Sequence, residues 1–441
     1  MSAIAERATA SRVIAEAPEP AQPRATPSPP RGDVLFVSRQ RITGPRNGSS
    51  AYLLDLAQAV RRAGYTPHLL QPSPDLMGRW PWLRLGSELS VFASHRIRGV
   101  IRMGRWVIAP DPRVGLAGLR GLAGRLLRRL GFAHPLLADR PHPYAVAAPW
   151  TARDHAFLRH GQRRAPAIVI ADYAFQTPAF AAFPGVPTAV VMHDLFHRRD
   201  GNGQDSVALL TQEQELALLS HADAAIAIQS AEAGFVRDHL PGVRPLLVPM
   251  AVRPAPAPQP GADDRLLFVG SNTAPNVVGL RWFFDQVWPS IRRQRPDTQL
   301  DIAGSVASAF PGGGPPGVHF HGMVPDLAPL YAAAGVAISP LTFGSGLKIK
   351  LVEALAHGKA VVATATTLQG VEDTCGGAVI QADDAARFAD AVVALAQAPD
   401  RRVALAAAAL DCARRHFSSQ ACHAAFIAWL EEQTSPAKVR R

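Results

Sequence analysis

Short apolar runs alternate with amphipathic segments along most of the chain. In the first half, apolar side chains recur at helical spacing in a helix expected from about Ser50 to Arg62. The buried-strand runs around it lie at 34–38, 66–70, 167–171, 188–194 and 224–228. Continuous apolar strands separated by helices are typical of parallel sheets that are covered on both faces. The pattern therefore predicts an α/β fold.

The alternation restarts after a proline-rich segment. Residues 249–264 contain five prolines and show neither a helical nor a strand period, which predicts a linker over 251–264. Beyond it, strands are expected at 265–271, 299–305, 318–324, 336–341, 360–364 and 378–382. We therefore predict two doubly wound, Rossmann-like domains facing each other across a cleft, at 31–250 and 265–415. The ends of the chain, 1–30 and 416–441, are predicted as a disordered tail and as a C-terminal helix with a tail.

Lysine is rare in this chain and concentrated at one place. Of the 46 lysines and arginines, only four are lysines, and two of these open a helix in the segment "GSGLKIKLVEALAHGKAVVAT" at 344–364. A helix from about 347 to 357 turns Leu351 and Leu355 toward a sheet and Lys350 and Glu353 away from it. Ligands of doubly wound sheets bind beyond the carboxyl ends of the strands, where this helix begins.

The start of this helix is suited to an anion. Gly344 and Gly346 allow the backbone to approach a ligand closely, and a helix N-terminus carries a partial positive charge. Lys348 and Lys350 add full positive charges, which suit a phosphate or diphosphate, whereas the Glu353 carboxylate suits ribose hydroxyl groups. A nucleotide carries both. The alternative is a surface ion pair between Lys350 and Glu353, with Lys348 extended toward solvent.

This region resembles a known family. "ISPLTFGSGLKIKLVEALAHGKAVVAT", followed by "GVED", is similar to the donor-binding signature of family 4 glycosyltransferases, which have the GT-B fold. The resemblance includes "FHGMVPDLAPLYAAAGVAISP" and "LLFVGSNTAPNVVGLRWFFDQVWPSI" and covers about 265–375. It implies retaining transfer of a sugar from a nucleotide-activated donor, bound by the second domain, to a glycan or lipid-linked acceptor at the first, as in polysaccharide biosynthesis. It implies neither a metal nor another cofactor.

The resemblance also implies roles for individual residues. Glu353 stands where the family binds the donor ribose, and Ser345 stands where the family has an acidic residue near the transferred sugar. The loop "GSNTAPNVVGL" lacks the positive charge that the family places there, so Lys348 and Lys350 are expected to neutralise the diphosphate. The remaining donor-binding candidates are Gly270 and Ser271 at the diphosphate, Val324 at the base, Gly344 and Gly346 in the loop, and Gly370, Val371 and Glu372 at the border.

The first domain contributes two weaker candidates. "GPRNGSS" at 44–50 resembles the glycine loop that closes over the sugar in the family, which implies roles for Arg46, Asn47 and Gly48. An ordinary strand-to-helix turn is the alternative. His193 ends an apolar strand where the family often has a histidine near the sugar, and with Asp194 it could equally form a capping or packing pair.

The net positive charge of the chain is concentrated in one part of the first domain. Residues 262–441 are electrically neutral, whereas 75–165 contain sixteen arginines against five acidic residues. Within this segment, 115–131 place Leu116, Leu119, Leu122, Leu126, Leu127 and Leu130 on one helical face and Arg125, Arg128 and Arg129 on the other. This fits a helix lying in a membrane interface, or a core-facing helix with a solvated basic face. The segment lacks interleaved aromatic platforms, which argues against nucleic acid as a partner.

Composition bears on location and leaves two rival functions open. No apolar run is long enough to cross a membrane, no signal peptide is recognisable, and three unpatterned cysteines suit a reducing cytoplasm. We therefore expect a cytoplasmic enzyme, peripheral at the inner face of an anionic membrane. A GT-B sugar-nucleotide epimerase would share the two domains. A non-catalytic sugar-nucleotide-binding protein would be consistent with the uncharged Ser345.

Overall fold

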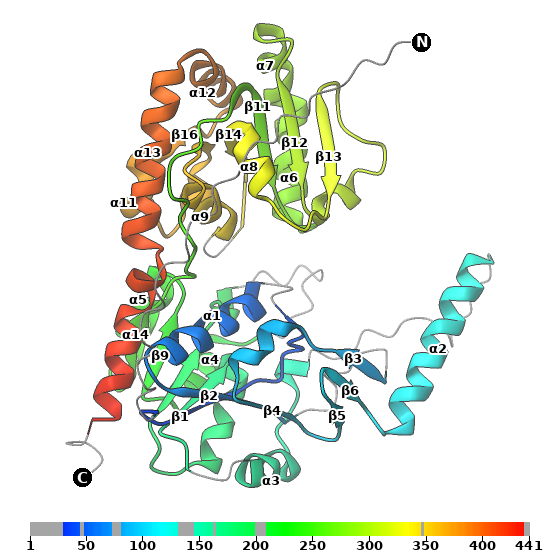
Figure 1. Ribbon diagram of the computed structural model, residues 1–441, viewed down its shortest axis with the longest axis vertical. Helices are drawn as coiled ribbons and strands as arrows, with labels where there is room; N and C mark the ends of the chain where they lie inside the picture. Colours follow the sequence, from blue (N-terminus) through cyan, green and yellow to red (C-terminus); the bar gives the residue numbers. More distant parts are fainter. Residues whose placement is uncertain are drawn as a thin grey trace, which may run out of the picture.

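A computed structural model describes residues 30–44, 48–72, 81–130, 145–161, 165–198, 209–344 and 348–435. They form two α/β domains, each built around a parallel sheet (Figure 1). Most of the predicted N-terminal tail lies outside the described residues, as do Arg46, Asn47, Ser345 and Gly346.

The first domain has a seven-stranded parallel sheet in the order β10-β9-β8-β7-β1-β2-β4. Every residue of the three adjacent strands β7, β8 and β9 is buried, because helices cover both faces of the sheet. The strands are β1 Asp33–Val37, β2 Thr66–Gln71, β4 Ser94–Ile97, β7 Ile168–Asp172, β8 Thr188–Val191, β9 Ala224–Ala227 and β10 Arg244–Leu247. The helices are α1 Gly48–Arg62, α3 Ala152–Gly161, α4 Gln212–Leu219 and α5 Ser230–His239.

A second, smaller sheet and a long helix extend from the first domain. Three short antiparallel strands pair in the order β3-β6-β5, with bounds β3 Trp82–Arg84, β5 Ile101–Met103 and β6 Trp106–Ile108. Helix α2, Pro112–Arg129, follows β6 and projects beside this sheet at the edge of the molecule (Figure 1). Leu116, Leu119, Leu122 and Leu126 are exposed and Leu127 is partly buried, so the core-facing alternative for this helix is wrong. No helix among the described residues is both long and apolar enough to cross a membrane.

The second domain has a six-stranded parallel sheet in the order β13-β12-β11-β14-β15-β16. Its strands are β11 Ala262–Val269, β12 Gln299–Ala303, β13 Val318–Gly322, β14 Ala334–Ser339, β15 Ala360–Ala363 and β16 Ile380–Gln381. Two apolar clusters fill its faces. The helices are α6 Ala274–Trp282, α7 Trp288–Gln294, α8 Ala328–Ala333, α9 Ile349–Ala356, α10 Ala365–Leu368, α11 Glu372–Cys375, α12 Ala385–Gln397 and α13 Pro399–His416.

The linker is shorter than predicted. Strand β11 begins at Ala262, where it pairs with Ala334 of β14, so the last three residues assigned to the linker belong to the sheet. The chain turns into the strand at Gly261, whose φ is +60° and whose missing Cβ would lie 1.9 Å from the Ala334 carbonyl oxygen. Only glycine fits this approach of two backbones.

The last helix returns to the first domain. Helix α14, Ser419–Gln433, places Phe426, Trp429 and Leu430 in the same apolar cluster as β1 and α1. The two crossings of the chain between the domains lie side by side, because Val252 and Ser418 form a parallel β-bridge. Figure 1 shows α13 and α14 running end to end along one side of both domains.

Candidate functional site

A cleft of about 520 Å³ lies between the two domains. The second domain supplies most of its lining from the carboxyl ends of β11, β12 and β14, from the loop after β13 and from the start of α9. The first domain contributes Gly48 and Ala51 at the start of α1, and Met250. Of the predicted site residues, six line this one cleft: Gly48, Gly270, Ser271, Val324, Lys348 and Lys350.

Two glycines bring the ends of β11 and β12 close together. Gly304 has a φ of +105°, and a Cβ there would lie 2.1 Å from the Gly270 carbonyl oxygen. The Gly270 amide donates to the Ala303 carbonyl at 3.0 Å. Side chains are absent at both positions, so backbone groups and the small Ser271 and Ser305 side chains form this wall of the cleft. A flat wall of this kind suits the close approach of a phosphate group.

The start of α9 forms the facing wall. Lys348 is the N-cap residue, its own side chain does not cap the helix, and the first turn contains no acidic residue. The Lys348 ammonium donates to the Gly344 carbonyl at 3.4 Å. Burial lowers the pKa of Lys348 from its ordinary value, and the carboxylates of Asp194 and Glu372 act in the opposite direction. The positive charge thus stands in a partly desolvated place, where it interacts strongly with an anion.

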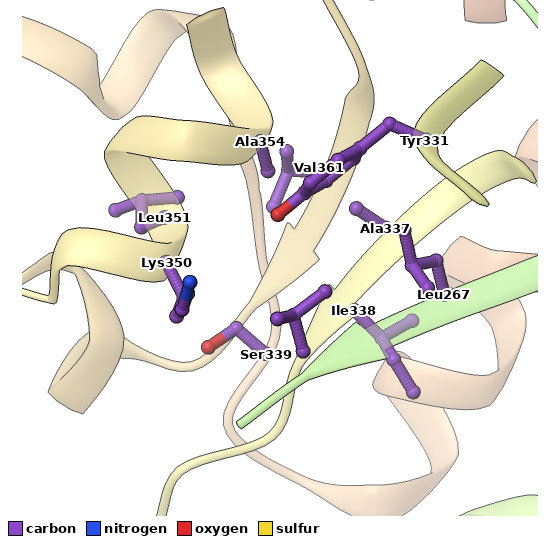
Figure 2. A pocket seen from close by; sticks show the side chains of 10 residues that line it. Leu267, Tyr331, Ala337, Ile338, Ser339, Lys350, Leu351, Ala354 and Val361 are labelled. Atoms are coloured by element: carbon purple, nitrogen blue, oxygen red, sulfur yellow. The ribbon is translucent and has the colours of Figure 1, made fainter. Parts of the chain in front are cut away.

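The floor of the cleft continues into a narrow pocket under α9. Figure 2 shows Lys350 and Ser339 at one end of this pocket and Tyr331, Ala354 and Val361 at the other. Its volume is about 20 Å³, room for a water molecule rather than for a sugar. Lys350 and Ser339 line both spaces, and of the two only the cleft has room for a sugar.

Glu353 is engaged by a neighbour on its own helix. Lys350 Nζ lies 2.5 Å from Glu353 Oε2, and the two side chains are 48% and 24% exposed. The surface ion pair between Lys350 and Glu353, which the sequence offered as the alternative to a ligand site, is therefore present. A pair this exposed contributes little to stability. Lys350 lines the cleft, whereas Glu353 does not.

His193 is held inside the first domain. Its Nε2 lies 2.6 Å from Asp172 Oδ1, and its ring packs against Tyr173 with centroids 4.1 Å apart. The same Asp172 accepts hydrogen bonds from Ser38 at 2.5 Å and from Gln40 at 3.1 Å. His193 and Tyr173 have φ values of +64° and +80°, which residues other than glycine rarely adopt. Such strain clusters at functional sites.

This network also fixes the end of the glycine loop. The Tyr173 hydroxyl donates to Ser49 Oγ at 2.7 Å, one residue after Gly48. A Cβ at Gly48 would lie 3.4 Å from Ile349 Cδ1, so the start of α1 touches the start of α9 across the cleft. Gly48, the described end of the predicted loop, therefore contacts the start of α9, which carries Lys348 and Lys350.

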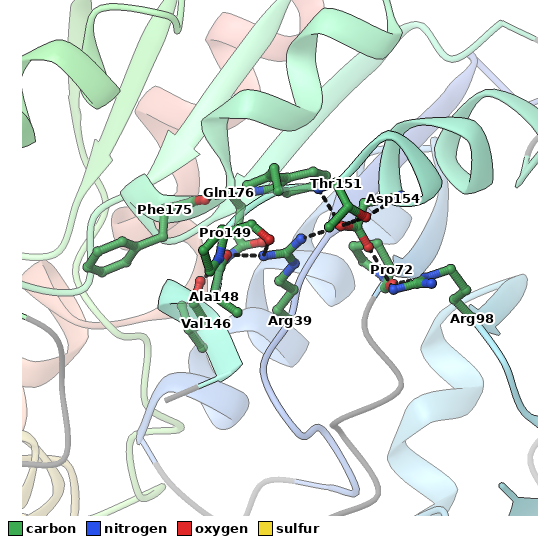
Figure 3. A network of polar contacts seen from close by, with 11 residues as sticks. Arg39, Pro72, Arg98, Val146, Ala148, Pro149, Thr151, Asp154, Phe175 and Gln176 are labelled. Atoms are coloured by element: carbon green, nitrogen blue, oxygen red, sulfur yellow. Dashed lines mark hydrogen bonds and ion pairs between the residues drawn. The ribbon is translucent and has the colours of Figure 1, made fainter. Parts of the chain in front are cut away.

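A buried ion pair supports the neighbouring turn after β1. Arg39 binds Asp154 at 2.9 Å, its guanidinium stacks over Trp150 at 4.2 Å, and it donates to the Ala148 carbonyl (Figure 3). Arg98 reaches the other carboxylate oxygen of Asp154 at 2.9 Å. Because both carboxylate oxygens of Asp154 are paired with arginines, these charges hold the carboxyl end of β1 in place.

The described candidates that do not line this cleft are His193, Gly344, Glu353, Gly370, Val371 and Glu372. Gly370, Val371 and Glu372 line a separate cavity of about 340 Å³, formed with Gln229 and Ser230 of the first domain. Glu372 Oε2 accepts a hydrogen bond from the Gly370 amide at 2.7 Å. Their link to the lysines of α9 is electrostatic, because the Glu372 carboxylate acts to raise the pKa of Lys348.

Comparison with known proteins identifies the second domain. Residues 263–398 match the family model described as "Glycosyl transferases group 1". The match lies within the second domain. It contains the cleft wall formed by Gly270 and the lysines of α9. A curated protein, the "Uncharacterized 44.6 kDa protein in cps region" of Klebsiella pneumoniae, is 27% identical over 139 residues. That match spans 29% of this chain and 36% of the Klebsiella protein.

Solved structures extend the similarity to both domains. Sucrose-phosphate synthase from Thermosynechococcus elongatus superposes with a TM-score of 0.56 at 14% identity, covering 91% of this chain and 98% of its own. Anabaena HepE in complex with UDP and glucose gives 0.57 at 13% identity, with 91% and 100% covered. A glycosyltransferase from Rickettsia africae gives 0.53 at 12% identity, with 92% and 99% covered. The predicted GT-B architecture is confirmed.

The predicted enzyme class is confirmed with it: the group 1 domain and the GT-B fold mark a glycosyltransferase. The comparisons do not favour the epimerase or the non-catalytic binding protein. The membership in family 4 and the stereochemistry remain predictions.

Proposed function

We propose that this protein transfers a sugar from a nucleoside diphosphate sugar to a glycan or lipid-linked acceptor, with retention at the anomeric carbon, as a family 4 enzyme of polysaccharide biosynthesis. One observation carries the proposal: Lys348 and Lys350 line the same cleft as Gly270 and Ser271. Two cations facing a glycine-rich strand end suit a diphosphate. The UDP in the HepE complexes makes a uridine diphosphate sugar the first donor to test.

Each side chain has a role in this proposal. Lys348 and Lys350 neutralise the charge that develops on the departing diphosphate, Glu353 binds the ribose, and Val324 lies against the base. Since the lysines supply this positive charge, the proposal includes no metal or other cofactor. Retention requires the acceptor oxygen to bond to the anomeric carbon on the face that the diphosphate leaves. The acceptor proton then passes to the departing phosphate oxygen.

The first domain would bind the acceptor. Gly48 approaches α9 most closely, and we include Arg46 and Asn47 of the same loop as contacts to the transferred sugar. We also include Ser345 and Gly346 as contacts to the sugar. Gly344 positions Lys348, His193 supports the sugar-facing end of β8, and Gly370, Val371 and Glu372 form the outer border. We place the enzyme in the cytoplasm, where nucleotide sugars are substrates.

The test begins with binding. Nucleoside diphosphates are screened by thermal shift, because a ligand of the folded state raises the melting temperature by mass action. The sugar forms of the best nucleotide are then incubated with oligosaccharide and lipid-linked acceptors, and products are detected by mass spectrometry. Proton NMR of the anomeric centre shows retention or inversion. We expect Lys348→Ala combined with Lys350→Ala to abolish transfer without loss of folding. Full transfer by this double variant would refute the proposed site.

A further inference from the structure

The segment between β2 and α3 gathers most of the exposed apolar side chains of the molecule. Among the described residues, fifteen large apolar side chains are exposed, and nine of them lie within residues 81–130. Isolated exposed apolar residues are ordinary, but a concentration of this kind marks an interaction surface. The nine are Trp82, Ile101, Met103, Trp106, Leu116, Leu119, Leu122, Leu126 and Leu130, and we call them the docking face.

The sheet part of the docking face follows from strand alternation. Leu83 and Val107, directly opposite each other, are buried against the first domain. Their neighbours in sequence point the other way because side chains alternate along a strand. Register pairs Ile101 with Ile108 and Met103 with Trp106 on this outer face. Trp82 and Trp106 are about half exposed there.

The helical part is a row along α2. Leu116, Leu119, Leu122, Leu126 and Leu130 recur at spacings of three and four residues and therefore share one side of the helix. Each is between 48% and 72% exposed. Figure 1 shows α2 projecting beside β3 and β6 rather than covering either large sheet. Nothing among the described residues buries this row.

The charge of residues 81–130 indicates which kind of partner binds the docking face. Residues 81–130 contain ten arginines, no lysine and only two acidic residues. A second copy docking through the same face would bring both sets of arginines together, because a two-fold interface is self-complementary. An anionic lipid bilayer offers the opposite charge and an apolar interior. Tryptophan is favoured at the level of lipid headgroups, and arginine can lie along apolar surface with its charge in water.

We propose that the docking face inserts into the headgroup region of an anionic bilayer, with α2 lying in the plane of the interface and the outer face of the β3-β6-β5 sheet beside it. This goes beyond the sugar-transfer proposal and is measured without a donor, so either can fail alone. The contact would hold the first domain at the membrane surface. An acceptor anchored in the same bilayer would then meet the cleft without diffusing through solution.

The test uses the full chain and two kinds of vesicle. One is phosphatidylcholine alone, and the other is equal parts of phosphatidylcholine and phosphatidylglycerol. We expect sedimentation with the anionic vesicles at low salt, weak binding to the neutral ones, and release at high salt. The variant Leu119→Ser with Leu126→Ser should lower the partition constant at least ~10-fold. The matched control, Leu209→Ser with Val403→Ser, removes exposed apolar side chains elsewhere and should bind as the wild type does.

A second measurement tests the sheet. Brominated lipid should quench tryptophan emission in the wild type, and Trp82→Phe with Trp106→Phe should lose most of this quenching. Circular dichroism and thermal unfolding verify that each variant is folded. The proposal is overturned if the wild type binds neither vesicle, if the leucine variant binds as well as its control, or if quenching survives in the phenylalanine variant. Dimers in light scattering that the leucine variant abolishes, without vesicle binding, would assign the face to a second copy.

Discussion

Replacing Glu353 with glutamine separates the two roles open to this carboxylate. In the structure it forms an exposed ion pair with Lys350 at 2.5 Å, three residues apart on one helix. Such pairs contribute about 0.2–0.5 kcal/mol to stability. If the pair were the whole role of Glu353, the variant would lose that small amount of unfolding free energy, and its nucleotide affinity would not change.

Ribose binding predicts a much larger effect on affinity. A hydrogen bond to a charged group contributes roughly 1.5–3 kcal/mol, whereas breaking the ion pair costs only a fraction of this. Glu353→Gln should therefore raise the dissociation constant of UDP about 10- to 100-fold, since 1.4 kcal/mol corresponds to a factor of ten. Inorganic diphosphate has no ribose. Its affinity should stay the same or rise, because Lys350 is released from its partner.

Isothermal titration calorimetry with UDP and with inorganic diphosphate measures both effects. Glu432→Gln is the matched control: Glu432 also forms an exposed ion pair, with Arg244, on α14. The control should lose a similar amount of stability and keep the affinity for UDP. Equal dissociation constants for UDP in the two variants would refute ribose binding by Glu353. Equal losses of UDP and inorganic diphosphate would show that its carboxylate acts on the lysines instead.

Three further predictions concern protonation and packing. Burial lowers the pKa of Lys348 from its ordinary 10.5. As pH rises, kcat/KM for the donor should therefore fall with a midpoint below 10.5, because the ammonium loses its proton. Lys348→Arg should move this fall to higher pH, and an unmoved profile would assign it to another group. Burial lowers the pKa of His95 from 6.5 to about 4. Between these pH values the imidazole takes up a proton in the unfolded chain but not in the folded protein. The free energy of unfolding, measured in urea, should therefore decrease by about 3 kcal/mol as pH falls from 6.5 to 4. His95→Gln should remove this loss, and an unchanged profile would exclude His95 as its source. Leu430→Ala should lower the free energy of unfolding by about 2–5 kcal/mol and lower the melting temperature of the first domain in calorimetry. An unchanged melting temperature would mean that α14 does not stabilise that domain.

The sequence predicted those parts of the site that depend on local pattern. Apolar runs located the central strands, and the stripe of Leu351 and Leu355 oriented α9 with both lysines at its exposed start. The carboxyl ends of parallel strands meet at one edge, so Gly270, Ser271, Val324 and the lysines were expected together. They line one cleft in the structure.

Contacts between distant segments could not be predicted in this way. The effect of the Asp194 carboxylate on the pKa of Lys348 depends on how the two domains are oriented relative to each other. The periodicity of apolar residues does not predict this orientation. The separate cavity at Gly370 has the same origin, because Gln229 and Ser230 of the other domain close it. The β3-β6-β5 sheet was missed for another reason. Strands of three residues are too short for an alternation to be recognised.

The side-by-side crossings at Val252 and Ser418 have a consequence for dissecting the protein. The second domain is an insertion within the first domain, which is completed only by α14. Cutting the gene after the linker would leave one fragment without Phe426, Trp429 and Leu430 in its core and the other with these side chains facing water. A chimaera that exchanges donor specificity should therefore replace 262–416 as an internal cassette and keep both ends of the recipient chain.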